Sequence, residues 1–303
     1  MEHPIHKSKM KINNMKILKL STIAGLLLFM SCNADKGCTL EYVKNNYYSH
    51  DLTGLVKSVE EISFKAVKKV GGIVKGERER EYSFEDDSRK YFNRDGNVIN
   101  TYESEPDGVF RLRSTVEYGI NGNEIEVFNY MPDGNLRDTS IYKYDGNVIE
   151  KTSYDADWRS GDISDLRTYE CDENVIVIKL LNSDRSLRYK EVYEYNDKGN
   201  RTVRRSFTFD GSLDGEFTYK HDENGNVIEE VNNSTQRKDV HEYNDKGDII
   251  LEKTYNSEYH THEYKYEYEY DKIGNWVQQI KFKDGQATYV LERKIEYFND
   301  MEG

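Results

Sequence analysis

The stretch Tyr193–Asn200 reads YEYNDKGN, and variants of it recur along most of the chain. The other copies are YFNRDGNVI from Tyr91, YKYDGNVI from Tyr142, YKHDENGNVI from Tyr219, EYNDKGDII from Glu242 and YEYDKIGNWV from Tyr268. The turn glycines of the series are Gly96, Gly122, Gly146, Gly199, Gly225, Gly247 and Gly274. Most neighbours lie about 25 residues apart, and a steady spacing of this kind indicates a repeat protein.

Each copy has the chemistry of a hairpin turn. In YEYNDKGN, Asn196 is placed to open a type I turn through its side chain, and Gly199 to take the left-handed conformation of a bulge. A weaker turn lies near the middle of each unit, as at Asp210-Gly211, where we expect more conformational freedom than at Gly225. Turn signals about every twelve residues are typical of short antiparallel strands.

The runs between turns alternate with a period of two. In HEYKYEYEY (262–270) the tyrosines Tyr264, Tyr266, Tyr268 and Tyr270 fall on one face, and charged residues fall on the other. No run between residues 55 and 300 has a helical pattern. The chain is therefore predicted to be all-β, with one face of the sheet packed and the other solvated.

Counting half-repeats predicts roughly 17 strands. An open sheet rarely exceeds about ten strands without curling or splitting. We therefore expect an elongated antiparallel β-meander of repeated hairpins that coils into a spiral or splits into packed layers. Neighbour contacts, as in other repeat arrays, would supply its stability.

At this point the chain resembles the YD-repeat, or RHS-repeat, family. The resemblance rests on Tyr144-Asp145, Tyr270-Asp271 and the Tyr-Asn variants, and it covers about residues 80–290. The family usually places Arg after the turn glycine, where this chain mostly has Asn. The chain is also too short for the cargo-enclosing shell of large RHS proteins. The resemblance is closer to short repeat lipoproteins of the Bacteroidetes type, and it implies no catalytic activity.

The N-terminal residues resemble an export signal. Lysines precede Leu20–Ser31, an uncharged apolar run that is too short to span a bilayer at about 20 residues per helix. Ser31-Cys32 resembles a lipobox, which predicts lipidation of Cys32, although a plain secretory signal remains an alternative. The predicted parts are a signal peptide (1–31), a lipidated flexible tether (32–51) and the repeat domain (52–303). Asn33 after the cysteine favours the outer membrane, facing either the periplasm or the cell surface.

Two further cysteines follow, Cys38 in the tether and Cys171 in the domain. Export permits a disulfide between them, but one free tether cysteine and one buried thiol is the simpler interpretation.

The composition of the chain argues against one class of partner and against disorder. The chain has 43 Lys and Arg against 56 Asp and Glu, a net charge of −13, which argues against binding to nucleic acid. Aromatic residues make up 13%, too many for a disordered chain.

No nucleophile elbow, phosphate-binding loop, dinucleotide fingerprint or zinc-protease motif is present in the sequence, so we expect a non-enzyme without cofactors. His260 and His262 share a strand face, and turns such as 222–226 have a weak likeness to calcium loops. Hairpin chemistry accounts for these residues as well, so no metal site is predicted.

The tyrosines are the remaining candidates for ligand binding. Tyr264, Tyr266, Tyr268 and Tyr270 would form a glycan platform if exposed, as would Trp158 and Trp276, whereas packing within the sheet is the simpler explanation. We expect a non-catalytic cell-envelope lipoprotein that binds a glycan or protein partner, or serves as a scaffold, through an extended β-surface. A carbohydrate-binding accessory protein is the alternative, and an immunity-type partner of a secreted toxin is a third possibility.

Overall fold

The computed structural model describes residues 52–78, 87–156, 163–257 and 259–299, without the side chain of His260. The expected signal peptide, Cys32, Cys38, the tether and Trp158 lie outside the described residues. Every regular element within these ranges is a β-strand, and the described residues contain no helix.

Nineteen strands follow one another within the described ranges. They are β1 (Val56–Lys69), β2 (Gly72–Arg78), β3 (Ser88–Phe92), β4 (Val98–Ser104), β5 (Phe110–Tyr118), β6 (Glu124–Tyr130), β7 (Leu136–Asp145), β8 (Val148–Asp155), β9 (Ile163–Asp172), β10 (Val175–Leu181), β11 (Leu187–Tyr195), β12 (Arg201–Thr208), β13 (Leu213–His221), β14 (Val227–Asn232), β15 (Arg237–Tyr243), β16 (Ile249–Asn256), β17 (Tyr259–Tyr270), β18 (Trp276–Lys283) and β19 (Gln286–Tyr297).

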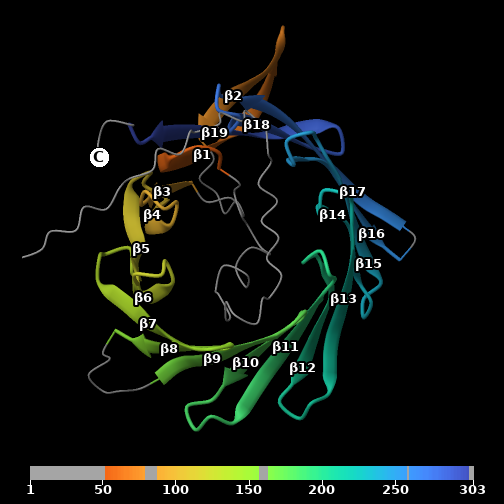
Figure 1. Cartoon of the computed structure of the whole chain (residues 1–303). Helices are drawn as coiled ribbons and strands as arrows, with labels where there is room; N and C mark the ends of the chain where they lie inside the picture. Colours follow the sequence, from red (N-terminus) through yellow and green to blue (C-terminus); the bar gives the residue numbers. More distant parts are fainter. Residues whose placement is uncertain (1–51, 79–86, 157–162, 258, 300–303) are drawn as a thin grey trace, which may run out of the picture.

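The sheet closes on itself as a barrel (Figure 1). From β3 onward each strand pairs antiparallel with the next, and β1 then pairs with both β19 and β3. Among the described residues, strand β2 pairs only with the far end of β1, so eighteen strands form the wall. The expectation of an elongated, open spiral or layered meander is therefore wrong. Closure pairs the first strand with the last and removes the two free edges of an open sheet.

The repeated turn has the expected mechanics. Asn196 Oδ1 accepts hydrogen bonds from the backbone N–H groups of Lys198 and Asn200, both at 3.0 Å, and Gly199 has a φ of +79°. The φ values of the other six turn glycines of the series are positive too. The expectation that the mid-unit turns are freer is wrong, because Gly211 has a φ of +86° against +90° at Gly225. Both kinds of turn use the left-handed conformation that glycine adopts most readily.

The two faces of the wall are assigned through β2, which lies outside the ring in Figure 1. Lys75 of β2 forms an ion pair of 2.7 Å with Glu292 of β19, so Glu292 is on the outer face. Strand register places Glu267 and Lys265 of β17 on that same outer face. Because neighbouring residues of a strand point to opposite faces, the tyrosines between them line the inner face.

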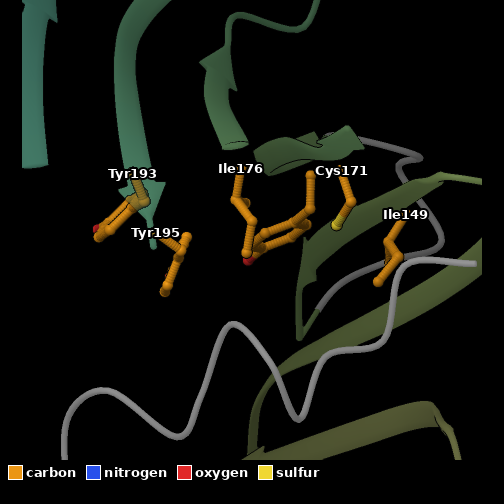
Figure 2. Close-up of a cluster of buried hydrophobic side chains, with 6 residues drawn as sticks. Ile149, Cys171, Ile176, Tyr193 and Tyr195 are labelled. Carbon is orange, nitrogen blue, oxygen red and sulfur yellow. The ribbon is translucent and has the colours of Figure 1, made fainter. Parts of the chain in front are cut away.

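Strand register, followed from β17 back to β10, places the main hydrophobic cluster on the inner face as well. Figure 2 shows Ile149, Cys171, Ile176, Tyr193 and Tyr195 from β8 to β11 on one side of the sheet. Ile149 and Ile176 are fully buried. Cys171 is disulfide-bonded, which excludes the buried free thiol as its state.

Candidate functional site

Tyrosine hydroxyls at one rim of the barrel connect successive repeats. Four of them donate to the backbone carbonyl that follows the preceding turn: Tyr118 to Val98 at 2.7 Å, Tyr144 to Glu124 at 2.7 Å, Tyr243 to Val227 at 2.8 Å and Tyr268 to Ile249 at 2.8 Å. Burial, and secondly the charges of Asp222 and Glu252, raise the pKa of Tyr243 to about 12. These tyrosines serve the packing of the repeats.

Tyr270 has a related structural role. Its hydroxyl donates to Asp248 Oδ2 at 2.6 Å and accepts from Asn244 Nδ2 at 2.7 Å, both in the preceding turn. Burial and this hydrogen bond to Asp248 raise the pKa of Tyr270. The row 264–270 therefore divides into two parts, and its two tyrosines nearest the turn, Tyr268 and Tyr270, are held by the fold.

The other two tyrosines of the row face lysines of the next strand. Lys283 is paired with Tyr264, and Lys281 with Tyr266. The Lys281 ammonium lies 5.1 Å from the ring centroid of Tyr264 and 5.8 Å from that of Tyr266, and Lys283 lies 5.8 Å from the Tyr264 ring. We call these four residues the Tyr–Lys surface. It offers aromatic area and positive charge side by side on the inner wall.

Residues beside the Tyr–Lys surface add a further aromatic ring and a further lysine to it, and one carboxylate. Tyr289 of β19 pairs with Lys281 on one side and with Lys65 of β1 on the other. Glu252 of β16 lies opposite Tyr264 and is the acidic neighbour in register. The result is a cationic and aromatic area within a chain of net charge −13.

Trp276 does not belong to this surface. The Arg293 guanidinium stacks 3.4 Å from the ring of Trp276 and forms an ion pair of 2.5 Å with Glu61 across the β1–β19 pairing. Arg293 is itself buried. Trp276 is thus a packing partner at the place where the barrel closes, and the expectation of a ligand contact there stays a prediction.

The possible metal ligands serve other contacts. His262 packs edge-on against Tyr264 with ring centroids 5.1 Å apart. Asp222 accepts three hydrogen bonds, each at 2.9 Å, from Asn224 and Asn226 within its own turn. The described residues contain no group of three or more His, Cys, Asp or Glu side chains placed to hold a metal ion.

Two shallow hollows lie away from the Tyr–Lys surface. One, of about 240 Å³, is lined by residues that include Leu52, Phe92 and Arg94. The other, of about 260 Å³, lies on the outer face around Glu60, Arg89 and Lys294. Both are small beside the pockets of roughly 300–1,000 Å³ that hold small ligands.

Sequence reasoning singled out Tyr264 and Tyr266 but missed Lys281 and Lys283. Lys281 and Lys283 are two residues apart in IKFKDG (280–285), and this spacing indicates that both point to the same face of a strand. Which tyrosines they face depends on the register of β17 with β18.

No protein-family model and no curated protein sequence matches the chain. Among solved structures, the chain is similar to a porin-like protein from Bacteroides uniformis, with a TM-score of 0.41 and 10% identity over 81% of this chain and 99% of that one. It is also similar to part of TcdB2-TccC3 without its hypervariable C-terminal region, with a TM-score of 0.27 and 12% identity. That match covers 67% of this chain but only 14% of the other. The function of this chain is therefore inferred from its own residues.

The described residues hold no helix that could span a membrane.

Proposed function

We propose that this chain is a non-catalytic lipoprotein of the bacterial cell envelope that binds its partner on the inner face of the barrel. The Tyr–Lys surface is the observation that carries the proposal. It is concave, aromatic and positively charged, whereas the next two tyrosines of the same row, Tyr268 and Tyr270, serve the fold.

The envelope location is supported by the sequence before residue 52. The basic residues, the apolar run to Ser31 and the cysteine after it have the order of a lipoprotein signal. Lipid on Cys32 would anchor the chain in the outer membrane, as the neighbouring Asn33 favours. The YD-repeat resemblance supports the same class of protein.

The outer wall of the barrel supports attachment through lipid rather than through the wall. Lys265, Glu267 and Glu269 point outward and are exposed. Ion pairs continue around the same face, as between Lys253 and Glu263 at 3.3 Å and between Lys220 and Glu229 at 2.7 Å. A wall that faces lipid carries an apolar band, and lysine at its midplane costs about 2–4 kcal/mol. This wall faces water.

A carbohydrate is the second candidate for the partner, and the Tyr–Lys surface favours an acidic one. Aromatic rings offer stacking area to sugar faces, and the Lys281 and Lys283 ammonium groups offer charge-assisted hydrogen bonds to carboxylates or sulfates. One ring contributes little, so a polymer that contacts several strands would gain by avidity.

The test is a binding assay of the full chain carrying Cys32→Ser on an array of neutral, uronate-containing and sulfated polysaccharides. We expect binding to the acidic polymers. Lys281→Gln combined with Tyr264→Ala should lower the apparent affinity by about tenfold or more, which is roughly 1.4 kcal/mol. Lys265→Gln is the control because it removes a lysine from the outer face of β17, the strand that carries Tyr264 on its inner face.

Absence of any glycan signal would reject the carbohydrate candidate and leave a protein partner or a scaffold role. Equal losses in the inner-face and outer-face variants would reject the Tyr–Lys surface as the site. Release of sugar fragments would overturn the non-catalytic assignment.

A further inference from the structure

The hairpin of β1 and β2 leaves the wall of the barrel. The pairing of β1 with β19 ends at Lys65 and Tyr289. Beyond it, Ala66–Lys69 pairs with β2 and with no other described strand. Figure 1 shows this hairpin extending past the ring formed by the other strands. It is therefore a finger with water on several sides.

The finger differs from the rest of the chain in composition. Residues 64–76 contain Lys65, Lys68, Lys69 and Lys75 but no Asp or Glu, although the chain as a whole has a net charge of −13. Its apolar residues are exposed as well. Val70 is fully exposed, and Val67 and Val74, which pair with each other across the strands, are 39% and 37% exposed.

The order of these residues along the finger is regular. Val70 and the two glycines Gly71 and Gly72, both at positive φ, form the tip. Lys68 and Lys69 follow directly behind it, and both are exposed. At the base, Lys75 is held by its ion pair with Glu292 and lies 4.9 Å from the ring of Phe64. The base is thus fixed on the barrel, and the tip presents valines with lysines behind them.

We propose that this finger contacts an anionic lipid bilayer, with Val70 entering the headgroup region and Lys68 and Lys69 at the phosphates. Apolar residues at a tip with cations behind them match the depth profile of a membrane interface. Each lysine near an anionic surface strengthens attachment electrostatically. The acidic remainder of the chain is repelled by that surface, so contact through the finger would also orient the barrel.

A protein partner fits this feature less well. A specific protein interface usually buries at least about 1,000 Å² with good shape complementarity. A two-stranded finger with an exposed tip offers little continuous flat area, whereas a bilayer requires no matching shape. The proposal is independent of the ligand of the inner face.

The test uses the full chain carrying Cys32→Ser and Val70→Trp, with the emission of the chain lacking Val70→Trp subtracted. Vesicles combine phosphatidylcholine and phosphatidylglycerol and include brominated lipid, which quenches tryptophan on contact. We expect a blue shift and loss of most of the introduced emission with these vesicles. Neutral phosphatidylcholine vesicles should have little effect.

Two variants complete the test. Lys68→Glu with Lys69→Glu, added to Val70→Trp, should restore the emission, because two glutamates are repelled by the anionic lipid. Both lysines are exposed, so we expect the double change to leave the fold intact. Ile120→Trp is the matched control, since Ile120 is an equally exposed apolar residue at another turn, without lysines beside it. The proposal would be overturned by equal quenching at positions 70 and 120, or by quenching that persists after the charge reversal. No quenching at position 70 would also overturn it and would leave a protein partner for the finger.

Discussion

Gly225 and Gly211 have nearly the same backbone conformation but different surroundings. A Cβ on Gly225 would meet Asn200 Oδ1 of the preceding repeat at 3.1 Å, whereas one on Gly211 would meet nothing within 4 Å. We predict that both Gly225→Val and Gly211→Val destabilise the chain, since a β-branched residue at positive φ costs roughly 1–3 kcal/mol. Gly225→Val should cost more, because Asn200 must also move.

Urea unfolding of the two variants measures this difference. Equal losses of unfolding free energy would show that the contact between successive turns has no energetic weight. A larger loss at Gly211 would contradict the prediction that the contact with Asn200 makes position 225 the more sensitive one.

At the scale of the element, several strand pairs are joined to the previous repeat by a tyrosine hydroxyl, as Tyr118, Tyr144 and Tyr243 show. Tyr243→Phe removes the hydrogen bond to the Val227 carbonyl while keeping the ring. We predict a loss of about 1 kcal/mol in unfolding free energy, the usual contribution of such a bond. Tyr264→Phe is the control, because no hydrogen bond of its hydroxyl joins it to another described residue, and it should change stability little. The same loss in both variants would contradict the assignment of a structural hydrogen bond to Tyr243 and of none to Tyr264.

The pairing of β1 with β19 closes the barrel, and we call it the seam. We expect its stability to depend on Arg293. Its guanidinium lies between Glu61 of β1 and the Trp276 ring of β18, with only 3% of the side chain exposed. Arg293→Ala should cost about 3 kcal/mol or more, because it leaves the partly buried Glu61 carboxylate without this partner.

Arg205→Ala is the comparison for Arg293→Ala, since its ion pairs with Glu194 and Glu216 are on the outer face and more exposed. Exposed pairs contribute about 0–1 kcal/mol. Thermal unfolding of both variants checks the prediction, and similar shifts in Tm would show that the seam is not a special point of the wall.

The whole barrel should weaken at alkaline pH. Burial, the largest cause in each case, raises the pKa of Tyr118, Tyr142 and Tyr144, and it raises that of Tyr243 to about 12. A tyrosine in the unfolded chain has a pKa near 10. The folded chain therefore holds more protons between about pH 10 and 12, and its stability is complete below that range and falls as pH rises through it.

Urea midpoints measured from about pH 8 to 12, with tyrosinate absorbance as a second reading, test this dependence on pH. Tyr243→Phe should reduce the slope. A midpoint that stays constant up to pH 12 would show that the tyrosines do not titrate abnormally in the folded chain.

Local chemistry made the turns and strands predictable. Asn196 and Gly199 specify a hairpin through a side-chain hydrogen bond and a positive φ, both of which depend on a few adjacent residues. The alternation in 262–270 likewise separated Tyr264 from Lys265 without any tertiary information. The lysine partners of Tyr264 and Tyr266 were not predictable, because they come from the register of a neighbouring strand.

By itself, the sequence determined an all-β repeat with tyrosines on one strand face and charges on the other, since these features follow from turn chemistry and a period of two. The tertiary structure decided that Val56–Lys69 pairs with Gln286–Tyr297 and closes the sheet. That pairing joins strands more than 200 residues apart and depends on curvature summed over every repeat, which no short stretch encodes. Closure in turn decided that the Tyr–Lys surface is concave and that the β1–β2 finger stands outside the wall.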